Sequence, residues 1–158
     1  MHSKIYQVGL KPMSEDDYVN EEHFLESSSS YADYIGDALE GEERKECIKN
    51  LAESLKEIFD YNEEEEALVY KGMGTFIHDW YEDIKAEVNC LNENEVHGIV
   101  LARIRNATRQ THLRLCSRFY IENWNDAADP LAELIEYVSW KMEVGDKLYI
   151  GNVIDFHW

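Results

Sequence analysis

The sequence predicts an α+β fold in which an antiparallel sheet carries helices on one face. Three patterns lead to this prediction. Apolar residues recur at three-and-four spacing in residues 42–59 and 76–88, and short extended segments begin and end the chain. Residues 97–121 change to the alternating pattern of strands. A chain of 158 residues with 44% hydrophobic content has the size of one globular domain, so we expect residues 1–158 to form a single domain.

The N-terminal part is expected to contain a strand, a loop and a first helix. Residues Lys4–Leu10 have the pattern of a short strand that ends before Pro12. Residues 14–30 are acidic and serine-rich, which indicates an irregular loop. Ser30 followed by Asp33 resembles a helix start. Five residues after it have helical spacing until Gly41: Tyr31, Tyr34, Ile35, Ala38 and Leu39.

Two longer segments give the clearest helical patterns. The apolar stripe of residues 42–59 comprises Ile48, Leu51, Ala52, Leu55, Ile58 and Phe59. Thr75 can cap the second helix, whose stripe we expect to be buried. That stripe comprises Phe76, Ile77, Trp80, Tyr81, Ile84 and Val88. Between the two helices Ala67–Tyr70 predicts a short strand, and Glu63–Glu66 suits either a helix N-terminus or a solvated loop.

Residues 97–121 predict a β-hairpin with one basic face. The expected strands are 97–105 and 111–121, joined by a turn at 106–110. Alternation places apolar side chains, among them Phe119 and Ile121, on one face of the hairpin. Four arginines fall on the opposite face: Arg103, Arg105, Arg114 and Arg118.

The C-terminal part predicts a third helix and a final strand. Asp129 as cap and Pro130 at the first helical position begin a helix that continues towards Gly145. In residues 147–158 five apolar residues share one parity: Leu148, Ile150, Ile154, Phe156 and Trp158. Alternatively, Gly151-Asn152 folds this segment into a small hairpin. The main elements follow the order of a ferredoxin-like split βαβ unit with an inserted helix, which would leave the arginine face of the sheet uncovered.

Charge is distributed unevenly along the chain. The formal net charge is -18, yet residues 97–118 contain five arginines and no acid. A protein this negative repels phosphate backbones and anionic membranes, so we expect no direct binding of nucleic acid or membrane. No apolar stretch near Met1 is long enough for a signal-peptide core. Three well-separated cysteines, Cys47, Cys90 and Cys116, fit reduced thiols, and we therefore expect a cytoplasmic protein.

The basic face is the first candidate site. Its arginines, with His112 and Tyr120, could bind a small anion or an acidic partner. The alternative is that acids of the N-terminal loop cover the same arginines in ion pairs. Those acids are Glu15, Asp16, Asp17, Glu21 and Glu22.

The acidic excess suggests a second candidate site, because carboxylates spaced over a rigid surface can imitate DNA phosphates. The two clearest helices would present Glu43, Glu46, Glu53, Glu57, Glu82, Asp83 and Glu87 to a basic protein. The alternative is that this acidity only keeps the protein soluble.

The sequence predicts neither an enzyme signature nor a cofactor or metal. His78 and Glu82 have the four-residue spacing of two metal ligands, but a site needs at least one more. Gly72-Met73-Gly74 lacks the third glycine and the lysine of phosphate-binding loops. Cys116 and His112 would lie about 13 Å apart along a strand, too far for a thiol and its base.

The favoured functional prediction is a small, acidic interaction module without enzymatic activity. Its partner would be another protein or a second copy of the chain, bound through charged surface and aromatic anchors. The alternatives are an acidic DNA mimic and an enzyme or small-anion binder with an arginine-lined site. A deep pocket with converging polar groups near Arg103, His112, Arg114 and Tyr120 would favour the enzyme.

Overall fold

The computed structural model describes residues 2–24, 32–89, 117–124 and 126–157, and these form a mixed sheet packed against helices. The strands are β1 (His2–Gly9), β2 (Tyr34–Ala38), β3 (Phe59–Asn62), β4 (Ala67–Tyr70), β5 (Arg118–Ile121), β6 (Ala128–Pro130) and β7 (Lys147–His157). The helices are α1 (Gly41–Ser54), α2 (Phe76–Asn89) and α4 (Leu131–Lys141), with 3-10 turns η1 (Glu15–Asp17) and η2 (Glu21–Phe24).

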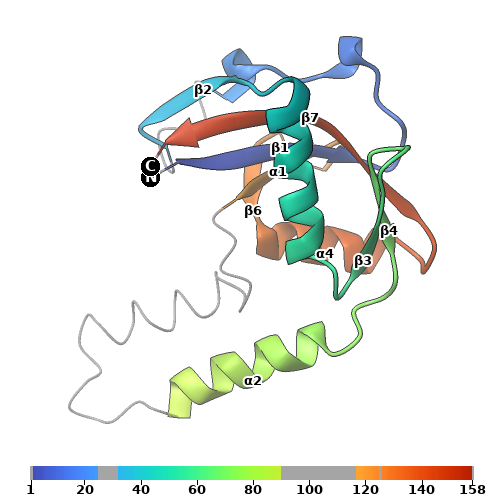
Figure 1. The fold of residues 1–158 in the computed structure, drawn as a ribbon. Helices are drawn as coiled ribbons and strands as arrows, with labels where there is room; N and C mark the ends of the chain where they lie inside the picture. The colour runs from blue at the N-terminus through green and yellow to red at the C-terminus, as the bar shows by residue number, and fades with distance from the viewer. Residues whose placement is uncertain (1, 25–31, 90–116, 125, 158) are drawn as a thin grey trace.

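The sheet has the strand order β3-β4-β7-β1-β5-β6, and β2 pairs with β7 beside this path (Figure 1). β1 and β5 are parallel, with Ile5 opposite Arg118 and Val8 opposite Ile121, whereas the other pairs are antiparallel. The predicted all-antiparallel sheet is therefore wrong, and the ferredoxin-like order is not confirmed. The reason is that β5 joins β1, a strand more than a hundred residues earlier in the chain.

Two apolar clusters lie on the sheet. The main core combines α1 and α4 with residues of β1, β4, β5 and β7; Phe119, Leu134 and Val153 are fully buried in it. The second core combines Phe24 with Ile35, Ile154 and Phe156, among others. Figure 1 shows α1 in front of the sheet and the η1–η2 segment along its upper edge. The described part of the sheet is therefore covered on both sides.

The helices predicted at 42–59, at 76–88 and from Pro130 towards Gly145 are confirmed with shifted ends. The first ends at Ser54, because Leu55–Ile58 form a turn and Phe59 begins β3. The third begins at Leu131, so Pro130 is its N-cap and not its first residue. The strands predicted at 4–10, 67–70 and 147–158 are also observed, the last as one strand. Residues 97–116 lie outside the described residues.

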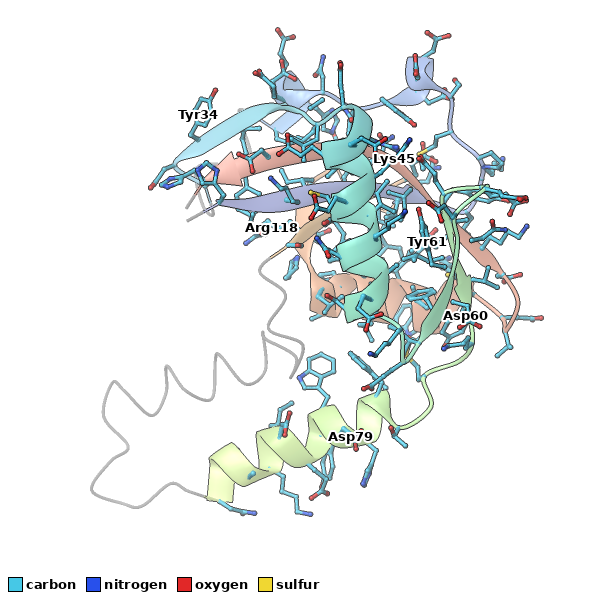
Figure 2. All side chains as sticks on the ribbon, viewed as in Figure 1. Tyr34, Lys45, Asp60, Tyr61, Asp79 and Arg118 are labelled. Atoms are coloured by element: carbon cyan, nitrogen blue, oxygen red, sulfur yellow. The ribbon has the colours of Figure 1, made fainter. Side chains whose placement is uncertain are left out.

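The helix predicted from Tyr31 to Leu39 is wrong, because its centre forms β2. Ile35 pairs with Phe156 and Ala38 with Ile154 of β7. Ile35 is buried in the second core, whereas Tyr34 stays exposed at the outer edge of β2 (Figure 2). Pairing with the longest strand of the described sheet thus overrides a five-residue helical spacing.

A β-bulge in β7 changes which of the two cores the side chains of this strand enter. Tyr6 pairs with Val153 and Val8 with Ile150, so two steps on β1 correspond to three on β7. The extra residue lies at Gly151-Asn152 and reverses which face the following side chains occupy. Ile150 and Val153 both reach the main core, whereas Ile154 enters the second core. The single face predicted for the apolar residues of this strand is therefore wrong.

Candidate interaction surface

Gln7 and Asn152 form a buried polar link between the bulge and the N-terminal segment. The Gln7 side-chain oxygen accepts hydrogen bonds from the backbone amides of Val19 (3.0 Å) and Asn152 (3.2 Å). Its Nε2 donates to the Asp17 carbonyl at 2.9 Å. The Asn152 Nδ2 donates to the Val19 carbonyl at 2.8 Å. The side chains of Gln7 and Asn152 thus fix residues 17–19 over the bulge. For the backbone amides of Val19 and Asn152, the Gln7 oxygen takes the place of a strand partner.

Arg44 is a second link to the same bulge. Its guanidinium donates to the Gly151 carbonyl at 2.6 Å and to the Glu66 carboxylate at 2.7 Å, and it lies 5.8 Å from the Tyr18 ring centroid. The Arg44 side chain is 13% exposed. This arginine therefore joins α1, the β3–β4 turn, β7 and the N-terminal segment through its two terminal nitrogens.

A cavity of about 690 Å³ lies beside Arg44, at the N-terminal end of α1. Its lining residues carry both signs of charge: Arg44 and Lys45 are basic, and Glu15 and Glu40 are acidic. Lys45 pairs with Glu42 at 3.1 Å. Because the cations here already have carboxylate partners, the cavity presents no concentrated positive charge to a small anion.

Two residues of the predicted basic site are described, and they lie on β5. The predicted alternation holds over Arg118–Ile121: Phe119 and Ile121 enter the main core, and Tyr120 packs against the second core. Arg118 Nη1 donates to the Ala128 carbonyl at 2.9 Å. The Tyr120 ring meets the His23 ring edge-on, with centroids 4.9 Å apart. The remaining predicted site residues, Arg103, Arg105, His112 and Arg114, lie outside the described residues.

The N-terminal loop covers this side of β5 through aromatic rings. Phe24 is fully buried, and its ring lies 5.7 Å from that of Tyr120. His23 Nε2 lies 3.0 Å from an Asp126 oxygen. Burial, with the nearby Asp126 and Glu122 carboxylates, raises the pKa of Tyr120. The covered side of β5 is therefore built by aromatic packing.

The predicted acidic surface is interrupted by cations along α1. Glu43, Glu46, Glu53 and Glu57 are exposed as predicted. However, residues 41–57 contain five acidic and four basic side chains, a net charge of -1. Lys56 pairs with Glu53 at 2.5 Å. A row of DNA-like negative charge requires uncompensated carboxylates, so α1 contributes little net charge to such a row.

The acidic segment Asp60–Glu66, which comprises the end of β3 and the β3–β4 turn, is largely neutralised by basic side chains. Four of its five carboxylates have basic partners, contributed by α1, by the end of β4 and by β7. The pairs are Asp60 with Lys71, Glu63 with Lys49, Glu65 with Lys147, and Glu66 with Arg44. Hydrogen bonding to Lys49 and its positive charge lower the pKa of Glu63. This segment therefore adds little net negative charge to an acidic surface.

Helix α2 differs from α1 and α4 because most of its apolar stripe is not buried. Phe76 is fully buried, and Trp80 packs partly against the main core. Beyond them Ile77 is 44%, Tyr81 57% and Val88 44% exposed. Figure 1 shows α2 below the rest of the fold, joined to β4 by residues 71–75. The prediction that this whole stripe is buried is wrong for these three residues.

The charged side chains of α2 lie beside this stripe or on the opposite side of the helix. Asp79 and Asp83 are four residues apart and lie on the side away from Ile77 (Figure 2 shows Asp79). Lys85, four residues after Tyr81, flanks the stripe; it pairs with Glu82 at 3.0 Å and lies 5.6 Å from the Tyr81 ring centroid. Residues 75–89 carry four acidic and one basic side chain, a net charge of -3. We call Ile77, Tyr81, Ile84 and Val88 the α2 face.

No family model, curated protein or solved structure matches this chain.

Chemical signatures in the described residues are correspondingly few. None of the helices in the described part of the chain is long and apolar enough to cross a membrane. Among the same residues there is no group of three or more potential metal ligands, and His78 and Glu82 gain no further ligand there. Three of the seven exposed large apolar side chains among the described residues, Ile77, Tyr81 and Val88, lie on the α2 face.

Sequence reasoning missed the structural roles of Gln7, Arg44 and Asn152. Gln7 and Asn152 lie within strands, and the sequence does not show that their side chains bond to the backbone of another segment. Arg44 is one of several charged residues on α1. The polar residue within the apolar run of β1 and the Gly-Asn pair within β7 are the only local signals.

Glu122 supplies a test of the electrostatics around β5. Burial and the nearby Asp17 raise the pKa of its carboxyl group. The folded state therefore holds this proton at pH values where the unfolded chain has lost it, and stability falls as the pH rises through the raised value. We predict that Glu122→Gln raises Tm by roughly 2 °C at pH 7 and leaves it unchanged at pH 4. Glu22→Gln, at an exposed position, should change Tm at neither pH; equal shifts in both variants would contradict the prediction.

Proposed function

We propose that this protein is a non-enzymatic interaction module that binds a protein partner through the α2 face. The single observation that carries the proposal is the exposure of Ile77, Tyr81 and Val88 on one side of a 14-residue helix. Burying them against a partner would remove apolar surface from water, at about 25 cal/mol for each Å². Scattered exposed apolar residues need no explanation, but a row at spacings of four, three and four residues forms a continuous strip.

The composition of the strip supports the proposal. Tyr81 is a large, amphipathic side chain of the kind that dominates the energetics of protein interfaces. The first turn of the helix is anchored by Phe76, which is fully buried in the main core. A partner would therefore meet an already formed helix, and less ordering entropy would oppose binding.

The experiment is site-specific photo-crosslinking in the cells that make the protein. A photoreactive phenylalanine analogue replaces Tyr81 in one variant and Tyr34 in the other. Both tyrosines are mainly exposed, at 57% and 64%, but Tyr34 lies on β2. We expect a discrete protein adduct from position 81, identified by mass spectrometry, and none from position 34. The proposal fails if neither position gives an adduct, or if both give the same mixture.

A matched substitution separates the α2 face from exposure in general. Ile77→Ser should reduce the position-81 adduct by about tenfold, since a truncated interface anchor costs more than about 1 kcal/mol. Leu10→Ser is the control, because Leu10 is 41% exposed and Ile77 44%. Equal losses in both variants would show that the adduct does not depend on the α2 face.

A further inference from the structure

We infer that the cavity beside Arg44 is a binding site for a neutral monosaccharide, either free or at the end of a glycan. This inference goes beyond the proposed function, because the cavity is lined by the N-terminal segment, the start of α1 and β7 and shares no residue with the α2 face. Its volume of about 690 Å³ lies within the range of small-molecule sites, about 300–1,000 Å³. The cavity is therefore large enough for a sugar ring with its hydroxyl groups.

The lining combines apolar surface with hydrogen-bonding groups. Tyr18, Ala38 and Leu39 supply apolar atoms, and Leu39 packs against the main core. Asn20 supplies an amide that can both donate and accept. A pyranose ring has the same mixture, because its C–H groups form an apolar face and each of its hydroxyls can donate and accept.

The charges of the lining favour a ligand without net charge. Two basic residues, Arg44 and Lys45, are matched by two acidic residues, Glu15 and Glu40. Both basic side chains already pair with carboxylates of the chain. An anionic ligand would compete with those carboxylates for its partners, and a cationic ligand would lie close to both basic side chains. A ligand of either sign would therefore lose hydration without full compensation.

Hydroxyl groups suit the polar groups that are available in the cavity. Glu15 and Glu40 have no basic partner among the described residues, so their carboxylates can accept hydrogen bonds from hydroxyls. The Glu40 side chain makes no capping bond, so the first backbone amides of α1 can donate to hydroxyl oxygens. Gly41 leaves space at this end of α1, because a Cβ there would meet no atom within 4 Å. Acceptors and donors thus line the same cavity.

One wall of the cavity is fixed by buried hydrogen bonds. Asn152 is 7% exposed; its side chain donates to the Val19 carbonyl at 2.8 Å and accepts from the Val153 amide at 2.9 Å. Arg44 is held by the Gly151 carbonyl. Because these bonds join the N-terminal segment and α1 to β7, less ordering entropy opposes binding.

The test is a titration of the full chain followed by amide NMR spectroscopy. The neutral probes are glucose, galactose and mannose, and the charged probes are the corresponding amino sugars and uronic acids, which differ in one group. We expect at least one neutral hexose to shift the amide signals of Asn20, Gly41 and Asn152, with a dissociation constant in the millimolar range. Its amino and acid counterparts should bind at least about tenfold more weakly. Cyclohexanol, a ring with a single hydroxyl, should not shift these signals.

The methyl glycoside of the bound hexose distinguishes the two sources of the ligand. A glycoside that binds as well as the free hexose indicates the end of a glycan, and a glycoside that does not bind indicates a free sugar. Both results support the inference, since both require the neutral ring.

Substitutions assign the binding to this cavity. Asn20→Ala should weaken the hexose about tenfold, because its hydroxyls lose an amide partner. Asn89→Ala is the matched control at an exposed position at the end of α2, and it should leave the affinity unchanged. Tyr18→Leu should weaken binding by a similar factor, whereas Tyr18→Phe, which keeps the ring, should preserve it.

The inference is overturned if no neutral hexose shifts these signals at concentrations up to about 100 mM. It is also overturned if an amino sugar or a uronic acid binds more tightly than its neutral counterpart, because the charges of the lining would then select a charged ligand. If a hexose binds and both Asn20→Ala and Tyr18→Leu leave its affinity unchanged, the site lies elsewhere and the assignment to this cavity is wrong. These results do not affect the proposed function, which photo-crosslinking from position 81 tests separately.

Discussion

Replacing Gln7 by leucine should lower the free energy of unfolding by about 3 kcal/mol, because two backbone amides lose their acceptor in a buried setting. Gln7 is 1% exposed, and its oxygen accepts from the amides of Val19 and Asn152. Leucine preserves much of the side-chain volume, so the loss reports hydrogen bonding more than a cavity. Urea titration followed by circular dichroism measures the change.

The control for Gln7→Leu is Asn50→Leu, which also replaces an amide side chain by leucine. Asn50 is exposed on α1, and this substitution should change stability by less than about 0.5 kcal/mol. If Gln7→Leu lowers the free energy of unfolding by less than about 1 kcal/mol, water or neighbouring groups accept the hydrogen bonds of the Val19 and Asn152 amides. The buried link would then not be an important determinant of this fold.

Replacing Arg44 by methionine should cost about 2 kcal/mol and loosen the N-terminal segment in particular. The Glu66 carboxylate and the Gly151 carbonyl both lose a charge-assisted hydrogen bond, and Tyr18 loses its stacked cation. Methionine keeps the apolar stem of the side chain, which limits the packing loss. Urea titration gives the total, and hydrogen exchange of the amides in residues 14–24 gives the local effect.

A double-mutant cycle with Glu66→Gln apportions the Arg44 effect. Glu66 is 32% exposed, so water can hydrogen-bond to its carboxylate when Arg44 is removed. We therefore expect a coupling free energy near 1 kcal/mol between Arg44 and Glu66. The rest of the loss should persist in the Glu66→Gln background, since it comes from the Gly151 carbonyl and Tyr18. A coupling equal to the whole loss would contradict a role for Arg44 in holding the bulge.

The sequence predicted those elements whose cause is local. Periodicity located α1, α2 and α4, because 14 or 11 residues give several turns of a repeating apolar pattern. Alternation over Arg118–Ile121 was also correct. The helix predicted from Tyr31 to Leu39 failed to form because this segment has too few helical turns to outweigh strand pairing with β7.

Features that depend on distant segments were not accessible from the sequence. The parallel pairing of β1 with β5 joins residues 5 and 118, and nothing in either strand specifies this partner. At the bulge of Gly151-Asn152, the backbone amide of Asn152 depends on the Gln7 side-chain oxygen as its acceptor. The pattern of α2 established an apolar face, but periodicity cannot tell whether that face packs within the chain or against another molecule.

The central claim is that the α2 face is accessible in the free protein and covered when a partner binds. Hydroxyl-radical footprinting of the unmodified chain tests it through the tyrosines already present. Tyr81 is 57% exposed, which is comparable to Tyr34, whereas Tyr70 and Tyr137 are buried. We predict that Tyr81 is oxidised as fast as Tyr34 in the free protein, and that the partner crosslinked from position 81 slows the oxidation of Tyr81 and not of Tyr34. Oxidation of Tyr81 as slow as that of Tyr70 in the free protein, or unchanged in the complex with this partner, would contradict the claim.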